Sequence, residues 1–121
     1  MKLLNLIIAF LLVSGTSFSQ TRGEIVSFNT KKVSNALVIT WMPTVEPETN
    51  YFEIQKSEDG TNWKVIAIMF PFEDASVPHS YKYVDKSLME GNSYYRIRQL
   101  DINKKEIFSK VRMFSKPIAE K

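Results

Sequence analysis

The stretch SYYRIRQLD, residues 93–101, decides the fold. Its residues alternate in polarity, and a period of two is typical of a β-strand with one buried face and one exposed face. If Tyr95 and Ile97 lie inward, Arg96 and Arg98 face solvent. The opposite choice would bury both arginines, at a cost of several kcal/mol for each unpaired charge. The sequence therefore predicts that Tyr95 is buried.

Turn signals divide the rest of the chain into further strands. β-Branched and aromatic residues cluster between these signals, and no long segment shows helical periodicity. The Asp59-Gly60 pair is a strong hairpin signal, because glycine adopts a positive φ without steric cost. The predicted strands are residues 24–33, 36–41, 51–57, 63–70, 80–85, 93–101 and 106–114. Seven strands without a cysteine pair predict an all-β, seven-stranded immunoglobulin-like sandwich of the fibronectin type III-like kind.

Alternation along each strand also predicts the core. The expected inward residues are Leu37, Ile39, Trp41, Phe52, Ile54, Tyr95 and Ile97. Gln55 is expected to face outward. On the last strand, the same logic predicts Val111 and Met113 inward, with Lys110 and Arg112 outward.

A buried tyrosine at the start of the sixth strand has a known role in such sandwiches. Its hydroxyl hydrogen-bonds back to the preceding corner of the chain. Tyr95 follows Met89 by six residues, and Leu88 with Tyr94 has the same spacing. Tyr95 is favoured because Ile97 continues its apolar face.

The ordered set of motifs resembles a known family. NYFEIQKSEDGTNWKVIAIM (residues 50–69) and YKYVDKSLMEGNSYYRIRQLDINKKEIFSKV (residues 81–111) are similar to the fibronectin type III-like module of secreted Bacteroidota proteins. That module is often found upstream of type IX secretion sorting domains. The resemblance covers about residues 36–113 and implies a sandwich in an exported protein.

The N-terminal segment has the pattern of a secretory signal peptide. Lys2 precedes an apolar run, Leu3–Val13, and the small residues Ser17 and Ser19 follow it. Such a run is too short to span about 30 Å of hydrocarbon. We expect cleavage before Gln20, and export to the periplasm, the cell surface or the medium. We therefore divide the chain into a signal peptide, residues 1–19, and one sandwich domain, residues 20–121.

Composition limits the remaining possibilities. A net charge of +3 is too mild to predict nucleic-acid binding. The absence of cysteine excludes disulfides and a lipid-modified cysteine. No stretch after the signal peptide is apolar enough to predict a membrane span.

The outward positions of the last two strands form a basic stripe with a tyrosine at its edge. Its residues are Tyr94, Arg96, Arg98, Lys110 and Arg112. The stripe is a candidate docking face for an acidic partner, a glycan or a lipopolysaccharide phosphate. The alternative is a solvated sheet whose charges pair with Glu53 and whose long side chains cover apolar neighbours.

A second candidate is the apolar segment MFPF, residues 69–72. Met69, Phe70 and Phe72 form either an exposed contact loop or a cover that folds back over the rim of the sandwich. His79 is the single histidine, so no metal site is expected. No catalytic or cofactor-binding motif is present, and we expect neither an enzyme nor a cofactor.

Two function classes remain. The first is a secreted, non-catalytic binding module of the cell envelope whose partner is a protein or a cell-surface glycan. The second is a structural spacer or assembly subunit with no ligand of its own. An apolar, unprotected edge strand would favour the second class, through strand addition.

Overall fold

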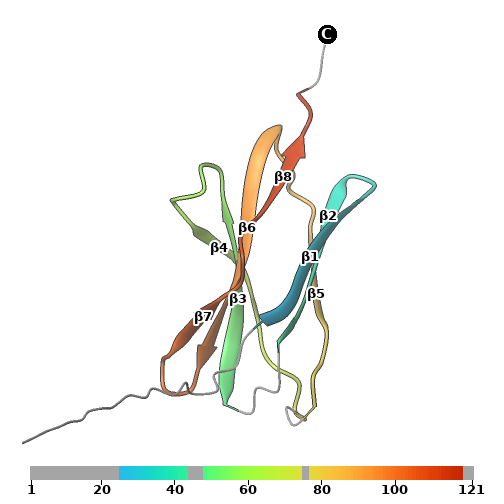
Figure 1. The fold of residues 1–121 in the computed structure, drawn as a ribbon. Helices are drawn as coiled ribbons and strands as arrows, with labels where there is room; N and C mark the ends of the chain where they lie inside the picture. The colour runs from blue at the N-terminus through green and yellow to red at the C-terminus, as the bar shows by residue number, and fades with distance from the viewer. Residues whose placement is uncertain (1–24, 44–47, 75–76, 119–121) are drawn as a thin grey trace, which may run out of the picture.

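The protein is an all-β structure of two antiparallel sheets that face each other (Figure 1). The computed structural model describes residues 25–43, 48–74 and 77–118. The expected signal peptide lies outside these ranges. None of the described segments is a helix that could cross a membrane. The strands are β1 (Ile25–Val33), β2 (Ala36–Pro43), β3 (Thr49–Ser57), β4 (Lys64–Met69), β5 (Tyr81–Asp85), β6 (Gly91–Asp101), β7 (Glu106–Phe108) and β8 (Arg112–Lys116).

Strand order defines a small and a large sheet. The small sheet has the order β1-β2-β5, so β1 is an edge strand, as its weak alternation predicts. The large sheet has the order β4-β3-β6-β7, and β8 also pairs with β6. β8 pairs with the first half of β6 and β7 with the second half. The long strand β6 therefore holds the C-terminal part of the large sheet together.

The described residues form eight strands, one more than expected, because residues 106–114 do not make one continuous strand. Ser109 interrupts it. The backbone N–H of Ser109 donates to the carbonyl of Ile97 at 2.9 Å, and its Oγ accepts the N–H of Ile97 at 2.8 Å. These bonds displace residues 109–111 from the ladder and change which residues of β8 face the core.

The prediction for β8 was therefore wrong. Val111 and Met113 are exposed instead of buried, and Phe114 packs against the core instead. Met113 lies opposite Tyr94, and Arg112 lies opposite Tyr95. Because paired residues share a face, Arg112 is on the side of the core and Met113 is on the solvent side.

The core confirms the inward residues predicted for the other strands. All seven are buried, together with Phe28 and Tyr81. Trp41 is at its centre and is 1% exposed. Its ring stacks on Tyr81 at 5.6 Å between centroids and meets the edge of Phe52 at 5.8 Å. One aromatic cluster thus joins strands from both sheets.

Replacing Trp41 by alanine should destabilise the protein severely. It removes a large buried side chain that contacts both sheets, so we expect a loss of about 3–5 kcal/mol in the free energy of unfolding. Chemical denaturation measures this loss. Val33→Ala, at an exposed position, is the matched control and should change stability by about 0.5 kcal/mol or less. Equal stability of the two variants would contradict the sandwich core.

Candidate functional site

A polar cluster links the two sheets at one end of the sandwich. The Tyr95 hydroxyl donates to Asp85 Oδ2 at 2.7 Å, and Lys56 Nζ donates to the same oxygen at 2.8 Å. Tyr95 is fully buried, as expected for the corner tyrosine. Its bond reaches a carboxylate at the end of β5. Leu88 packs against the core, whereas Met89, six residues before Tyr95, is exposed.

Hydrogen bonding keeps Asp85 ionised although it is buried. Burial alone would raise the pKa of Asp85. Hydrogen bonds from Lys56, Tyr95 and the backbone N–H of Ser87 outweigh burial and lower that pKa below its ordinary value. Burial and the bond to Asp85 also raise the pKa of Tyr95, which therefore stays a donor.

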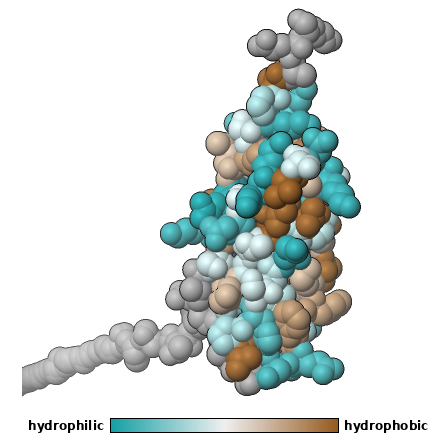
Figure 2. Space-filling model, turned by 90° about the vertical axis from the view of Figure 1, so that its right-hand side faces the viewer, coloured by the Kyte–Doolittle hydropathy of each residue, from teal (hydrophilic) through white to brown (hydrophobic). Residues whose placement is uncertain are grey.

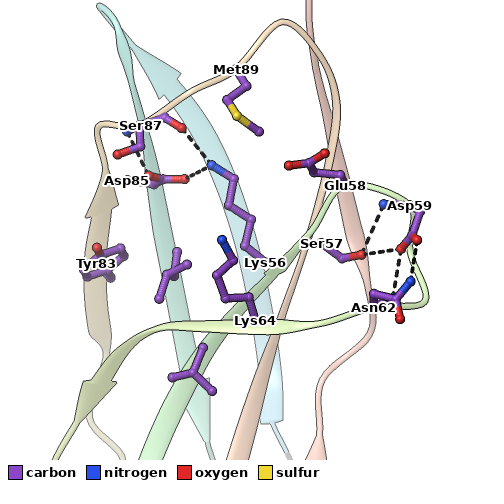
Figure 3. A pocket seen from close by; sticks show the side chains of 12 residues that line it. Lys56, Ser57, Glu58, Asp59, Asn62, Lys64, Tyr83, Asp85, Ser87 and Met89 are labelled. Carbon is purple, nitrogen blue, oxygen red and sulfur yellow. Dashed lines mark hydrogen bonds and ion pairs between the residues drawn. The ribbon is translucent and has the colours of Figure 1, made fainter.

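This cluster forms one wall of a cleft of about 670 Å³ between the edge strands β4 and β5. Figure 3 shows Lys56 and Lys64, neighbours on β3 and β4, both directed into it. Asp59 lies at the far side. Hydrogen bonds from the backbone N–H groups of Asn62 and Thr61 lower its pKa, so its carboxylate holds the predicted hairpin turn.

Several ionisable side chains line the cleft. Three of them are held by hydrogen bonds: Lys56 and Asp85 in the polar cluster, and Asp59 in the hairpin turn. Across residues 25–43, 48–74 and 77–118, no three His, Asp or Glu side chains are grouped closely enough to hold a metal ion.

The outer face of the large sheet carries a stacked arginine. The guanidinium carbon of Arg96 lies 4.3 Å from the ring centroid of Trp63 and 4.3 Å from that of Phe108. Its Nε donates to Gln55 Oε1 at 2.7 Å. Gln55 is on the outer face, as predicted, but Arg96 and its neighbours bury it. Contact of a guanidinium with two rings fixes the arginine in place.

Arg98, the next outward residue on β6, is paired with two carboxylates. Its Nη1 lies 3.1 Å from Glu53 Oε2, and its Nη2 lies 2.6 Å from Glu106 Oε2. Burial alone would lower the pKa of Arg98, but the bond to Glu106 and the charge of Glu53 outweigh burial and raise it. The pairing with Glu53 that the solvated-sheet alternative predicted is present.

The structure brings only part of the predicted basic stripe together. Tyr94, Arg96 and Arg98 share the outer face, as predicted. Arg112 does not, because it reaches across to β1. Its Nε donates to the Phe28 carbonyl at 3.0 Å and its Nη2 to Asn29 Oδ1 at 3.3 Å. The break at Ser109 is the physical reason.

Lys110 is not placed on the outer face by strand pairing. It is exposed in the segment between β7 and β8, where no ladder fixes its direction. Its carbonyl accepts a hydrogen bond from Ser109 Oγ at 2.8 Å. Strand pairing therefore places three of the five predicted residues, Tyr94, Arg96 and Arg98, on a common face.

The surface that does form is more aromatic than basic. We call it the arginine–aromatic face; its members are Tyr51, Trp63, Phe70, Tyr94, Arg96, Arg98 and Phe108. Sequence reasoning missed Trp63 and Phe108 as members. Trp63 precedes β4, and Phe108 ends β7 at the break, so strand alternation alone does not fix their direction.

Both outer faces carry exposed apolar side chains. Figure 2 shows the side of the small sheet, where an apolar patch lies among hydrophilic residues and further apolar areas lie below it. On the large sheet, the exposed apolar side chains extend from Ile68 on β4 to Phe108 on β7 and Met113 on β8.

The MFPF segment does not act as one loop. Met69 packs against the core, and Phe70, 69% exposed, contacts Tyr51 on the arginine–aromatic face. Phe72 folds against the rim, 5.0 Å from Tyr81 and 4.4 Å from His79 between ring centroids. The contact-loop interpretation fits Phe70 alone, and the rim interpretation fits Phe72.

Comparison with known proteins gives matches among solved structures. No family model and no curated protein matches the chain. A pectate lyase from Erwinia chrysanthemi in complex with tetragalacturonic acid matches 77% of this chain with a TM-score of 0.55 and 15% identity. A pectate lyase from Pectobacterium carotovorum matches 83% with a TM-score of 0.56 and 15% identity. A β-1,2-glucanase from Parabacteroides distasonis matches 83% with a TM-score of 0.54 and 18% identity.

The likeness is one of fold. The chain corresponds to 28% of each pectate lyase chain and to 14% of the glucanase chain. At identities of 15–18% these matches support the two-sheet architecture.

The polar cluster should make stability fall in acid. The unfolded-state pKa of an aspartate is about 3.9, and that of folded Asp85 is lower. The stabilisation is therefore complete above about pH 4 and is lost as the pH falls through the folded-state value. Asp85→Asn should cost about 1–3 kcal/mol at pH 7 and should show a shallower loss on acidification.

Denaturant unfolding between about pH 7 and pH 2 measures this difference. Glu58→Gln, which removes an exposed carboxylate at the same cleft, is the control and should follow the wild-type curve. An Asp85→Asn curve parallel to wild type would contradict the role of the cluster.

Proposed function

We propose that this protein is an exported, non-catalytic binding module of the cell envelope that contacts a partner protein through its arginine–aromatic face. The observation that carries the proposal is the position of Arg96 between Trp63 and Phe108 on an open sheet face. Aromatic residues and arginine are enriched at the centres of protein interfaces and supply most of the binding energy there.

The charges of this face favour a partner held mainly by packing. Arg98 is compensated by Glu53 and Glu106, and Arg112 lies elsewhere. Attraction of an acidic partner is therefore weaker than the basic stripe implied. Arg96 instead acts as a flat, fixed surface between two aromatic rings, which lowers the entropy lost on binding.

Two features support a fibronectin type III-like sandwich as the scaffold. The fourth strand, β4, lies beside β3, whereas in constant-type immunoglobulin domains the fourth strand lies beside the fifth. In addition, Tyr95 binds back to the corner after β5 through Asp85. Both agree with the family resemblance of the sequence.

A non-catalytic role is supported by the chemistry of the side chains. The chain has one histidine, His79, whose Nε2 lies 2.6 Å from the Asp74 carbonyl, and it has no cysteine. The solved enzymes that it resembles are several times longer, and the likeness covers 14–28% of their chains. This partial match supports an accessory module.

Export should be visible at the N-terminus of the purified protein. The signal-peptide pattern predicts a chain that begins at Gln20, which intact-mass spectrometry of protein from the periplasm or the medium checks. Protein that retains Met1 and stays in the cytoplasm would contradict export.

Binding should depend on the rings that hold Arg96. The partner is recovered by affinity capture of the tagged protein from its own envelope. The double variant Trp63→Ala/Phe108→Ala should then bind that purified partner about tenfold more weakly or worse, because interface aromatics are typical hot spots. Calorimetry measures the affinity, and circular dichroism checks the fold.

Lys82→Ala, at an exposed position on the small sheet, is the matched control and should bind like wild type. Unchanged binding by the double variant, or retention of the protein on envelope polysaccharide alone, would refute the proposed contact. A structural or assembly role is the second candidate function. The outward side chains of the edge strand β4 carry no charge, so this edge is not protected against pairing with another strand.

A further inference from the structure

The β4 edge of the large sheet differs from the other sheet edges. An exposed edge offers unpaired backbone N–H and C=O groups, and proteins usually protect it with charged side chains. The described edge strands β1, β5, β7 and β8 carry such charges at positions that include Lys31, Lys82, Glu106 and Lys116. In β4 the one charged residue, Lys64, is directed into the cleft (Figure 3).

An irregularity in β4 determines which of its residues face outward. Ala67 is opposite Ile54, but Val65 is opposite Gln55, so Ile66 is an extra residue. Ile66 and Ala67 both pack against the core. Val65 and Ile68, paired with the outward residues Gln55 and Glu53, face solvent and are 44% and 53% exposed.

The resulting order of side chains is the same in both directions along the strand. Four side chains point outward, and their types are symmetric: Trp63 and Phe70 at the ends are aromatic, and Val65 and Ile68 between them are aliphatic. One inward residue separates each aromatic residue from its aliphatic neighbour, and two inward residues, Ile66 and Ala67, separate Val65 from Ile68. A two-fold axis pairs a strand with its own reversed sequence. Such an edge is therefore complementary to a second copy of itself.

We propose that two copies of this protein pair their β4 strands antiparallel across a two-fold axis. Val65 then lies opposite Ile68 of the second copy, and Trp63 lies opposite Phe70 of the second copy. Inward Lys64 lies opposite Met69, so the two lysines do not face each other. This register matches outward with outward and inward with inward residues at every position from Trp63 to Phe70.

The pairing joins the two large sheets into one continuous sheet. It places the two arginine–aromatic faces side by side on the same surface, and so offers a partner two copies of the contact. Two six-residue edges bury less surface than the standard interface of about 1,600 Å². The dimer is therefore expected to dissociate on dilution. It does not depend on the proposed binding function.

Sedimentation velocity of the exported protein over a wide concentration range tests the dimer. Wild type should shift from monomer to dimer as concentration rises. Ile68→Lys places a charge at each symmetric contact and should weaken dimerisation by about tenfold or more. Val33→Lys, at a similarly exposed position on the β1 edge, is the matched control and should dimerise like wild type. A monomer at all concentrations, or equal dimerisation of both variants, would overturn the proposal.

Cysteine cross-linking tests the register itself. The natural chain has no cysteine, so introduced thiols are the only ones present. Directly opposed residues approach within disulfide distance, so Val65→Cys/Ile68→Cys should give covalent dimers on mild oxidation. Ile68→Cys alone should give few, because the two copies of position 68 are diagonal. Equal cross-linking by the single and double variants would show that the two β4 strands do not pair in this register. A monomeric chain whose β4 edge binds a strand of another protein would show that the edge does not pair with a second copy.

Discussion

The contact on which the structure depends is the junction of Tyr95, Asp85 and Lys56. It joins β6 and β3 of the large sheet to β5 of the small sheet through one carboxylate. Burying a carboxylate is costly, and its donors compensate that cost only while all of them are in place. In a chain without disulfides, this junction is a directional link between the sheets, whereas apolar packing is not directional.

The junction also determines which side chains lie on the outer face of the large sheet. Once Tyr95 is fixed inward, strand geometry places Arg96 and Arg98 on the opposite face. Arg96 then lies over Trp63 and Phe108, and Arg98 lies between Glu53 and Glu106. The candidate binding surface is thus a direct consequence of how the core is closed.

Alternation and turn chemistry made most of the fold predictable. The stretch ALVITW predicted the buried side of β2, and Asp59-Gly60 predicted the β3–β4 hairpin, where Gly60 has a φ of 81°. What the sequence could not show depends on contacts between distant residues. Ser109 breaks the last strand because it bonds Ile97, and this break places Arg112 against β1. No local pattern contains that information, so the predicted basic stripe was correct only for its β6 residues, Tyr94, Arg96 and Arg98.

The two tryptophans of the chain occupy opposite environments. Trp41 is enclosed by the core, while Trp63 lies on the surface against an arginine. Indole fluorescence depends on the polarity and charge around the ring, so the two residues report on different events. Emission from Trp41 changes when the sandwich unfolds, and emission from Trp63 changes when another molecule binds the outer face of the large sheet. The protein therefore carries a separate intrinsic optical probe for folding and for contact.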